Sequence, residues 1–461
     1  MPRVDKRERA KAGKEARASA RRSAHGEWQP AADREDPIAI LERQAVPRVP
    51  ELVPIRYGRM AVSPFAFFRG AAAVMAADLA PTPISGLRVQ ACGDAHLSNF
   101  GAYAAPDRRL VFDLNDFDES LPGPWEWDVK RLAASFAIAA RENGLDARWR
   151  ETILLRVTRT YREAMRDFAA QRNLDVWYAR FDIEEALAEV EHEDSKEVKR
   201  VRKGVGKART KDSLRALERL TETVDGEVRF RSEPPLLVPG EELVAAETGR
   251  SPQEILEGVL AAYRDSLPCD RQHLLDGFEF RQIARKVVGV GSVGTRAWVV
   301  LMAGVDGGDP LFLQAKEAEA SVLEPYAGAS RFANHGQRVV EGQRLMQAAS
   351  DIFLGWCPAV GIDGSQRDFY VRQLWDWKRS ADVERLSPAG LEVYARMCGQ
   401  TLARAHARSG DRVAIAAYLG AGDSFDRAIA AFSEAYAEQN LRDHEALVTA
   451  IESGRLEALE A

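Results

Sequence analysis

Two short apolar segments, 86–91 and 110–114, are predicted to be strands, and each ends in a cluster of polar side chains. The first leads into GDAHLSN at 93–99, and the second leads into NDFDE at 115–119. Carboxylates held this close together are costly unless a cation or a proton neutralises them. Oxygen ligands without a paired set of His or Cys favour Mg²⁺ over Zn²⁺. The two strand ends therefore predict a magnesium site.

The spacing within these segments is typical of a phosphotransferase. In protein kinases a catalytic aspartate accepts the proton of the attacking hydroxyl, and an asparagine five positions later binds Mg²⁺. A further metal-binding aspartate follows at the end of the next strand. Here Asp94 and Asn99 are five positions apart, and Asp116 begins a DFD turn. We predict Asp94 as the catalytic base and Asn99, Asp116 and Asp118 as metal ligands.

The loop most closely resembles that of the small-molecule kinases of the aminoglycoside phosphotransferase and choline kinase group, which reads HGDxHxxN. Cys92 occupies the position of the first histidine of that motif. His96 matches the second histidine, and we expect it to brace the loop. The segment WEWDVKRLAAS, in which Asp128 opens a predicted helix, also resembles the segment that follows the metal-binding turn in that group.

A phosphate-binding motif follows far downstream. Gly289, Gly291 and Gly294 form GxGxxG between two predicted strands, where backbone N–H groups would close over phosphates. The glycines join two antiparallel strands and not a strand to a helix, which excludes a dinucleotide-binding fold. Lys316 lies on the third strand, 25 residues after Gly291, where a kinase places the lysine that binds the nucleotide phosphates. These residues predict an ATP site.

The helix that follows the lysine strand is predicted to supply an acidic partner. Glu341, within NHGQRVVEGQRLMQ, is the expected ion-pair partner of Lys316, and Glu324 is the alternative. Lys286 is a second candidate for the phosphate-binding lysine.

The order of the motifs is that of a kinase cut before the catalytic loop and rejoined. Such permutation is tolerated when the original termini lie close together at the surface. We predict an α+β, bilobed, protein-kinase-like fold that is circularly permuted, with a helix-rich large lobe and a small antiparallel β lobe. The expected segments are a basic disordered tail (1–35), a large-lobe segment with a helical insertion (36–277), the nucleotide-binding β lobe (278–378) and helices that return to the large lobe (379–461).

Several long segments together resemble a bacterial family, domain of unknown function 2252. Among them are RMAVSPFAFFRGAAAVMAADLA, CGDAHLSNFG, LNDFDESLPGPWEWDVKRLAAS and RVVEGQRLMQAASDIFLGW. The resemblance extends over residues 36–450. It implies a kinase-like fold at most and leaves the reaction and the substrate open.

The charge of the chain limits the partners that it would bind. The net charge of −6 argues against a dedicated nucleic-acid-binding protein, although residues 1–26 carry a local charge of +6 that would bind nucleic acid or anionic lipid weakly. No secretory signal and no apolar stretch long enough to span a bilayer is present, and the four cysteines form no CxxC pair. These features predict a cytoplasmic bacterial protein without membrane insertion.

The leading functional hypothesis is a Mg²⁺-dependent, ATP-using phosphotransferase whose acceptor, a small molecule or a protein, the sequence does not define. Three alternatives stay open: transfer of AMP on the same fold, a metal-dependent phosphoesterase that uses the acidic cluster, and a nucleotide-binding module without turnover. The basic stretch 196–219 contains GVGKART but lacks the first glycine of a P-loop, so we expect a mobile loop there.

Overall fold

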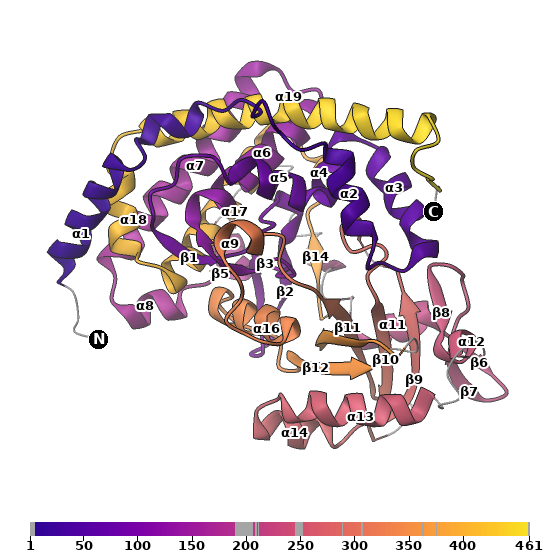
Figure 1. Cartoon of the computed structure of the whole chain (residues 1–461). Helices are drawn as coiled ribbons and strands as arrows, with labels where there is room; N and C mark the ends of the chain where they lie inside the picture. The colour runs from indigo at the N-terminus through magenta and orange to yellow at the C-terminus, as the bar shows by residue number, and fades with distance from the viewer. Residues whose placement is uncertain are drawn as a thin grey trace.

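The computed structural model describes residues 5–189, 206–207, 210, 212–244, 252–287, 289–305, 308–360, 364–374 and 376–459. A mass of helices lies beside an antiparallel sheet (Figure 1), which confirms the predicted α+β class. Most of the basic stretch before residue 212 lies outside the described residues, so the mobile loop predicted there is not tested. Within the described residues, none of the helices combines the length and apolar character needed to cross a bilayer.

The helices of the described chain are α1 (Lys6–Glu15), α2 (Pro37–Ala45), α3 (Val53–Ala61), α4 (Pro64–Gly70), α5 (Ala72–Leu79), α6 (Trp125–Glu142), α7 (Ala147–Ala170), α8 (Asn173–Tyr178), α9 (Ile183–Glu189), α11 (Ser213–Leu220), α12 (Gly240–Val244), α13 (Pro252–Asp265), α14 (Cys269–Leu275), α15 (Glu324–Ala327), α16 (His335–Met346), α17 (Pro388–Ser409), α18 (Arg412–Leu419) and α19 (Ser424–Glu452). The strands are β1 (Arg88–Ala91), β2 (Phe100–Ala104), β3 (Leu110–Leu114), β4 (Leu121–Pro124), β5 (Phe181–Asp182), β6 (Thr221–Val224), β7 (Glu227–Phe230), β8 (Leu237–Pro239), β9 (Glu279–Lys286), β10 (Ala297–Ala303), β11 (Pro310–Ala318), β12 (Gly355–Val360), β13 (Gln366–Gln373) and β14 (Arg379–Ser380).

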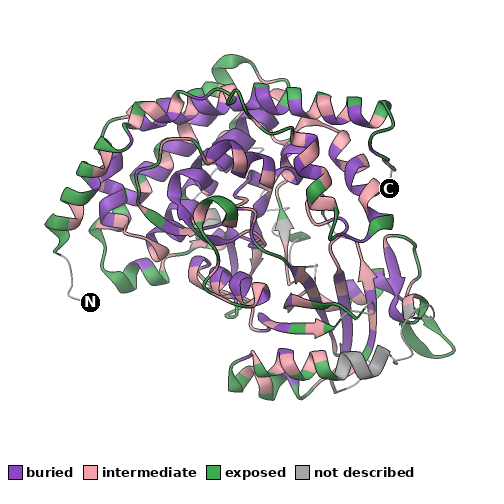
Figure 2. Ribbon diagram, viewed as in Figure 1, coloured by how far each residue is buried: buried purple, intermediate pink, exposed green. Residues whose placement is uncertain are grey.

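The helical lobe is built around α6, which is buried almost along its whole length (Figure 2). Helices α7, α17 and α19 pack with α6 around one large apolar core. At its centre Trp125 is fully buried and its ring stacks on Tyr161. Burial of one such side chain contributes about 1.5–3 kcal/mol. Asp146 and Ser387 cap α7 and α17 by accepting backbone N–H groups of the first turn.

Short strands of the helical lobe bring the two acidic segments together. β1 pairs with β4, and β2 and β3 form a hairpin within the order β14-β2-β3-β5. The backbone N–H of Asn115, just after β3, donates to the carbonyl of Asn99, just before β2, at 3.0 Å. The loops 92–99 and 115–119 therefore lie side by side, as the sequence predicts.

The small lobe is a six-stranded antiparallel sheet in the order β12-β13-β11-β10-β9-β8. Lys316 on β11 faces Ala297 of β10 on one side and Tyr370 of β13 on the other. Helix α16 connects β11 to β12 in the chain and contacts both β12 and β13. Helices α13 and α14 lie along the opposite end of the sheet from the helical lobe (Figure 1).

The boundary between the lobes differs from the one predicted at residue 277. β8 is part of the sheet, and Ala216 and Leu220 of α11 pack with Phe312 of β11. Tyr263 and Leu267 of α13 and its following turn likewise pack within the small-lobe core. Residues 212–244 and 252–277 therefore belong to the small lobe and not to a helical insertion of the large lobe, because apolar side chains of both segments pack on the sheet.

The helical periodicity of residues 64–80 is divided between two helices, α4 and α5. Ser63 caps α4, because its hydroxyl accepts the N–H of Ala66 at 3.2 Å. Helix α4 ends at Gly70, and Ala71 has a non-helical φ of −109° and ψ of 36°. The carbonyl of Gly70 accepts a hydrogen bond from buried Arg56 at 3.0 Å. This tertiary contact replaces a helical hydrogen bond, which the apolar periodicity alone does not indicate.

The basic segment at the N-terminus is not a disordered tail in its described part. Helix α1 packs on α18, and Gly13 lies so close that a Cβ there would meet the carbonyl oxygen of Ala414 at 2.0 Å. Arg17 and Arg22 donate to the carbonyls of Tyr418 and Leu419 at the C-terminal end of α18. Those carbonyls have no partner within the helix and carry a partial negative charge. Part of the positive charge of the segment is therefore used inside the fold.

Candidate active site

A cavity of about 480 Å³ lies between the helical lobe and the sheet. Its lining comes from loop 92–99, the DFD turn, the glycine loop 289–294, the end of β11 and the N-terminal helices α2–α5. Of the residues predicted to act, Asp94, Asn99, Asp116, Asp118, Gly289 and Gly291 line the cavity. Lys316 reaches the same place through its bond to Asp118, described below. Segments about 200 residues apart in the sequence thus meet at one site.

Asp128 holds the backbone of loop 92–99 in place. Its carboxylate accepts the backbone N–H groups of Cys92 at 2.6 Å and Gly93 at 2.9 Å. The Nε2 atom of buried His406 lies 3.1 Å from the same carboxylate, and its Nδ1 lies 2.8 Å from the hydroxyl of Tyr161. His406 is therefore a buried core residue whose two ring nitrogens both have partners. This chain of bonds fixes the backbone on which Asp94 stands.

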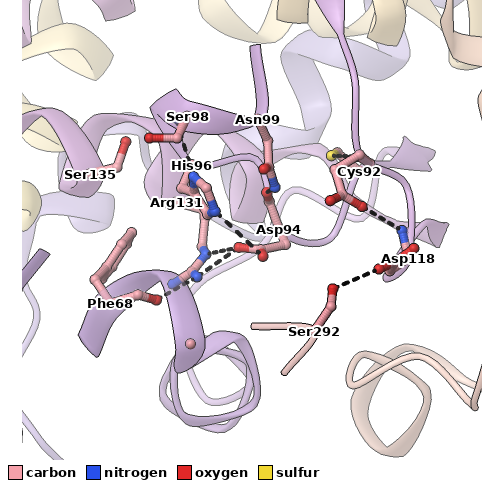
Figure 3. A network of polar contacts seen from close by, with 12 residues as sticks. Phe68, Cys92, Asp94, His96, Ser98, Asn99, Asp118, Arg131, Ser135 and Ser292 are labelled. Atoms are coloured by element: carbon pink, nitrogen blue, oxygen red, sulfur yellow. Dashed lines mark hydrogen bonds and ion pairs between the residues drawn. The ribbon is translucent and has the colours of Figure 1, made fainter. Parts of the chain in front are cut away.

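Asp94 forms a close ion pair that sequence reasoning missed. Buried Arg131 of α6 donates to the Oδ1 atom of Asp94 from Nε at 2.8 Å, and its guanidinium lies over the ring of Phe68 (Figure 3). The side-chain amide of Asn99 donates to the carbonyl of Asp94 at 2.7 Å. Both residues orient the aspartate. The available signal was the three-residue spacing of Asp128 and Arg131, which places both on one face of a helix.

His96 has the bracing role that we expect from the sequence. Its Nδ1 atom accepts the backbone N–H of Ser98 at 3.2 Å, and its Nε2 atom lies 3.8 Å from Asp94 Oδ2. Burial lowers the pKa of His96 to about 3, so the imidazole is neutral at physiological pH. Because the imidazole is neutral, the residue that offsets the negative charge of Asp94 is Arg131.

The DFD turn and the lysine strand meet across the lobes. Lys316 Nζ lies 2.6 Å from Asp118 Oδ2 and 4.0 Å from Asp116 Oδ2. The hydroxyl of Tyr370 donates to the other oxygen of Asp118, and Ser292 of the glycine loop donates to Oδ2 at 3.4 Å (Figure 3). Both oxygens of Asp118 are therefore engaged. Asp118 is therefore the ion-pair partner of Lys316 in this structure, and its assignment as a metal ligand stays a prediction.

The ionisable side chains around the DFD turn shift the pKa values of one another. Burial lowers the pKa of Lys316, but Asp116 and Asp118 outweigh it and hold the pKa above the ordinary value. Burial raises the pKa of Asp116, but Lys316 and Arg372 outweigh it and hold that pKa below the ordinary value. Both side chains are therefore charged at neutral pH. Burial raises the pKa of the neighbouring Glu119 to about 7, although the N–H of Val322 donates to its carboxylate at 2.7 Å.

The predicted ion pair between Lys316 and Glu341 is replaced by the pair with Asp118. Glu341 pairs instead with Arg344 on the same helix, at 3.2 Å, and its side chain is 38% exposed. The residue of α16 that reaches the site is Arg338, which is buried and donates to the carbonyls of Asp118 and Ser120 at 2.7 and 2.8 Å. Helix α16 thus holds the DFD turn through an arginine.

The glycine loop is anchored by a residue far away in the sequence. Arg48 Nη1 donates to the carbonyl of Gly291 at 3.0 Å and to that of Val293. The backbone N–H of Val49 donates to the carbonyl of Gly294 at 2.8 Å. Because these bonds use carbonyls, they leave the N–H groups of the loop to other partners. No local pattern in the sequence identifies Arg48.

Replacing Gly294 with alanine is expected to lower the free energy of unfolding by about 1–3 kcal/mol. Gly294 has φ of +89°, and a Cβ there would meet the side chain of Arg48 at 3.1 Å. Gly289→Ala is the matched control, because its φ is +64° but its Cβ would meet nothing within 4 Å. Urea unfolding of both variants would show the larger loss for Gly294→Ala, and equal losses would mean that the contact with Arg48 has no effect.

Comparisons with known proteins give one match. Curated proteins and solved structures yield none. The family model described as "Uncharacterized protein conserved in bacteria (DUF2252)" matches residues 48–450. This span includes all of the cavity lining except Ile40, Arg43 and Gln44 of α2 and Pro47 after it. That span is most of the 461-residue chain. The chain therefore belongs to the DUF2252 family of bacterial proteins.

Proposed function

We propose that the protein is a Mg²⁺-dependent phosphotransferase that uses ATP. The observation that carries the proposal is the meeting of Lys316 and the glycine loop with Asp94 and Asp116 around one cavity. These residues come from two parts of the chain, and each part alone is a weak motif. A phosphoryl transfer site needs both parts together, because it works by positioning and charge neutralisation.

The arrangement of the sheet supports the same proposal. The glycine loop joins antiparallel strands β9 and β10, and the lysine stands on the next strand, β11. Helix α16 then follows and contacts the turn that bears Asp116 and Asp118 through Arg338. In kinases the lysine strand and the following helix stand in this relation to the glycine loop and the metal-binding turn. The permuted kinase-like fold is therefore part of the proposal.

In the proposed reaction the acceptor hydroxyl attacks the γ-phosphorus of ATP. A new O–P bond forms as the bond from that phosphorus to the β–γ bridging oxygen breaks, ADP leaves, and the hydroxyl proton passes to the carboxylate of Asp94. Arg131 holds Asp94 in place without entering the reaction. Lys316 and the N–H groups of the glycine loop would bind the phosphates, since an ammonium paired with Asp118 still has two other N–H donors.

Asn99 and Asp116 are the residues that would hold Mg²⁺. Within the described residues there is no group of three or more His, Cys, Asp or Glu that forms a metal site by itself. Mg²⁺ fits this set nevertheless, because it is commonly bound by one or two carboxylates together with water and substrate phosphates. When bound, it would neutralise charge on the β- and γ-phosphates. A phosphoesterase built from the acidic cluster has less support, because Asp94 and Asp118 are both paired with cations.

Lys316→Met is expected to weaken ATP binding about tenfold or more, because the variant loses a charge-assisted contact with the phosphates. Binding would be measured with Mg²⁺ by titration calorimetry and by thermal shift, where ligand at 100 times its dissociation constant adds about 2.7 kcal/mol. Lys286→Met is the matched control, because Lys286 lies on the same sheet but its charge is influenced by Arg219 and Glu233 and not by the DFD turn.

The product then identifies the reaction. Label from γ-labelled ATP in the acceptor supports phosphoryl transfer, and label from α-labelled ATP would mean AMP transfer. Absence of any stabilisation by ATP or GTP with Mg²⁺ would overturn the proposal. Equal losses in the Lys316 and Lys286 variants would remove the assigned role of Lys316.

A further inference from the structure

Arginines line the wall of the cavity that faces loop 92–99. Arg48, Arg56 and Arg69 come from the segment between α2 and α4, and all three line the cavity. Arg48 and Arg56 are 9% and 1% exposed. Burying a cation is costly unless an anion pairs with it. A row of such cations on one wall therefore requires an explanation.

Among the described residues, the carboxylates that attract the charges of Arg48 and Arg69 lie beyond ion-pair distance. No ion pair joins any of the three to a described carboxylate. The Nε and Nη1 atoms of Arg56 are buried and have no hydrogen-bond partner. The same is true of the Nε atom of Arg69. Arg43 on the same wall differs, because it pairs with Glu35. The unpaired charge is thus specific to the part of the wall near the glycine loop and Asp94.

Arg69 lies beside both the glycine loop and the two acidic loops of the cavity. Its backbone carbonyl would lie 3.2 Å from a Cβ on Gly291, and the carboxylates of Asp94 and Asp116 both act on its charge. Burial lowers the pKa of Arg69, and these two carboxylates oppose that shift. Arg131 already neutralises Asp94, so Arg69 remains available to a ligand. Arg48, in contrast, uses its Nη1 on the glycine loop.

We propose that the acceptor is an anionic compound, with a phosphate or carboxylate group that binds Arg56 and Arg69 while its hydroxyl faces Asp94. This assignment rests on the proposed phosphotransferase function. A carboxylate or phosphate accepts two parallel N–H bonds from a guanidinium, which is the strongest pairing for such a side chain.

The test uses the full chain loaded with Mg²⁺ and a non-hydrolysable ATP analogue, so that the nucleotide site is filled. Inorganic phosphate and malonate are then titrated by calorimetry as the two anionic probes. We expect at least one to bind, and Arg69→Gln to weaken it about tenfold or more. Arg43→Gln, whose charge is already paired, should leave binding unchanged. Arg56→Gln is a second variant, and Arg69→Gln keeps the test valid if Arg56→Gln does not fold.

The outcomes separate the two proposals. Failure of the analogue to bind overturns the phosphotransferase function and the acceptor assignment with it. Binding of the analogue without binding of either anion overturns the acceptor assignment alone. If Arg69→Gln weakens binding of the analogue but not binding of the anions, the arginines bind the nucleotide phosphates. That result would also overturn the acceptor assignment. Stronger binding of phosphate than of malonate identifies the anionic group as a phosphate, and the reverse identifies a carboxylate.

Discussion

Asp94→Asn is expected to reduce the rate of phosphate transfer about 10²–10⁴-fold, the range for loss of a general base. The affinity for ATP should stay close to that of the unchanged protein, because Asp94 is assigned to the acceptor hydroxyl and not to the nucleotide. An asparagine keeps the shape of the side chain and one oxygen that can accept from Arg131. What it loses is the capacity to take up the proton.

Turnover and ATP binding of this variant should be measured separately, by product formation and by calorimetry. Asp376→Asn is the matched control, since Asp376 also pairs with an arginine, Arg108 at 2.9 Å, but lies outside the cavity lining. Its turnover should be unchanged. Unchanged turnover in Asp94→Asn would contradict the assignment of the base, and a parallel loss of ATP affinity would point to a role in nucleotide binding.

Asp128→Ala is expected to lower the free energy of unfolding by about 3 kcal/mol or more and to abolish turnover. Asp128 is 1% exposed and accepts the N–H groups of Cys92 and Gly93. An alanine leaves both N–H groups buried without a partner, and it leaves His406 without its carboxylate. The backbone under Asp94 then loses its support.

An exposed acceptor provides the comparison. Asp146→Ala removes a carboxylate that also accepts a backbone N–H, that of Trp149 at 2.9 Å, but at the surface. Its expected cost is about 1 kcal/mol, the usual value for an N-cap. Urea unfolding and turnover of the two variants would show whether burial makes the difference. A midpoint for Asp128→Ala equal to that of Asp146→Ala would contradict the bracing role.

Local patterns in the sequence predicted the elements that build the site. The strand at 110–114 and the antiparallel strands around the glycine loop are present, and the helices predicted within 379–461 correspond to α17, α18 and α19. These elements are long or strongly patterned, so their apolar periodicity is clear. The proximity of the two acidic loops also followed from the sequence, because each loop directly follows a strand.

Contacts between distant segments were not predicted. Lys316 pairs with Asp118 and not with Glu341, because the choice depends on how the lobes meet and not on the helix that follows the strand. The N-terminal segment packs on α18 through arginines that bond to backbone carbonyl groups. Every residue has such a carbonyl, so the residue types do not indicate which ones an arginine will contact. Arg48 holds a loop 243 residues away for the same kind of reason.

The bonds from Arg48 and Val49 to the glycine loop bear on the entropy of binding. A glycine-rich loop that is free in solution loses much backbone freedom when it closes on a ligand, and this loss weakens affinity. Here three carbonyls of the loop are already held by a neighbouring segment. The loop is therefore preorganised, and ordering it should oppose ligand binding less than it would for an unanchored loop.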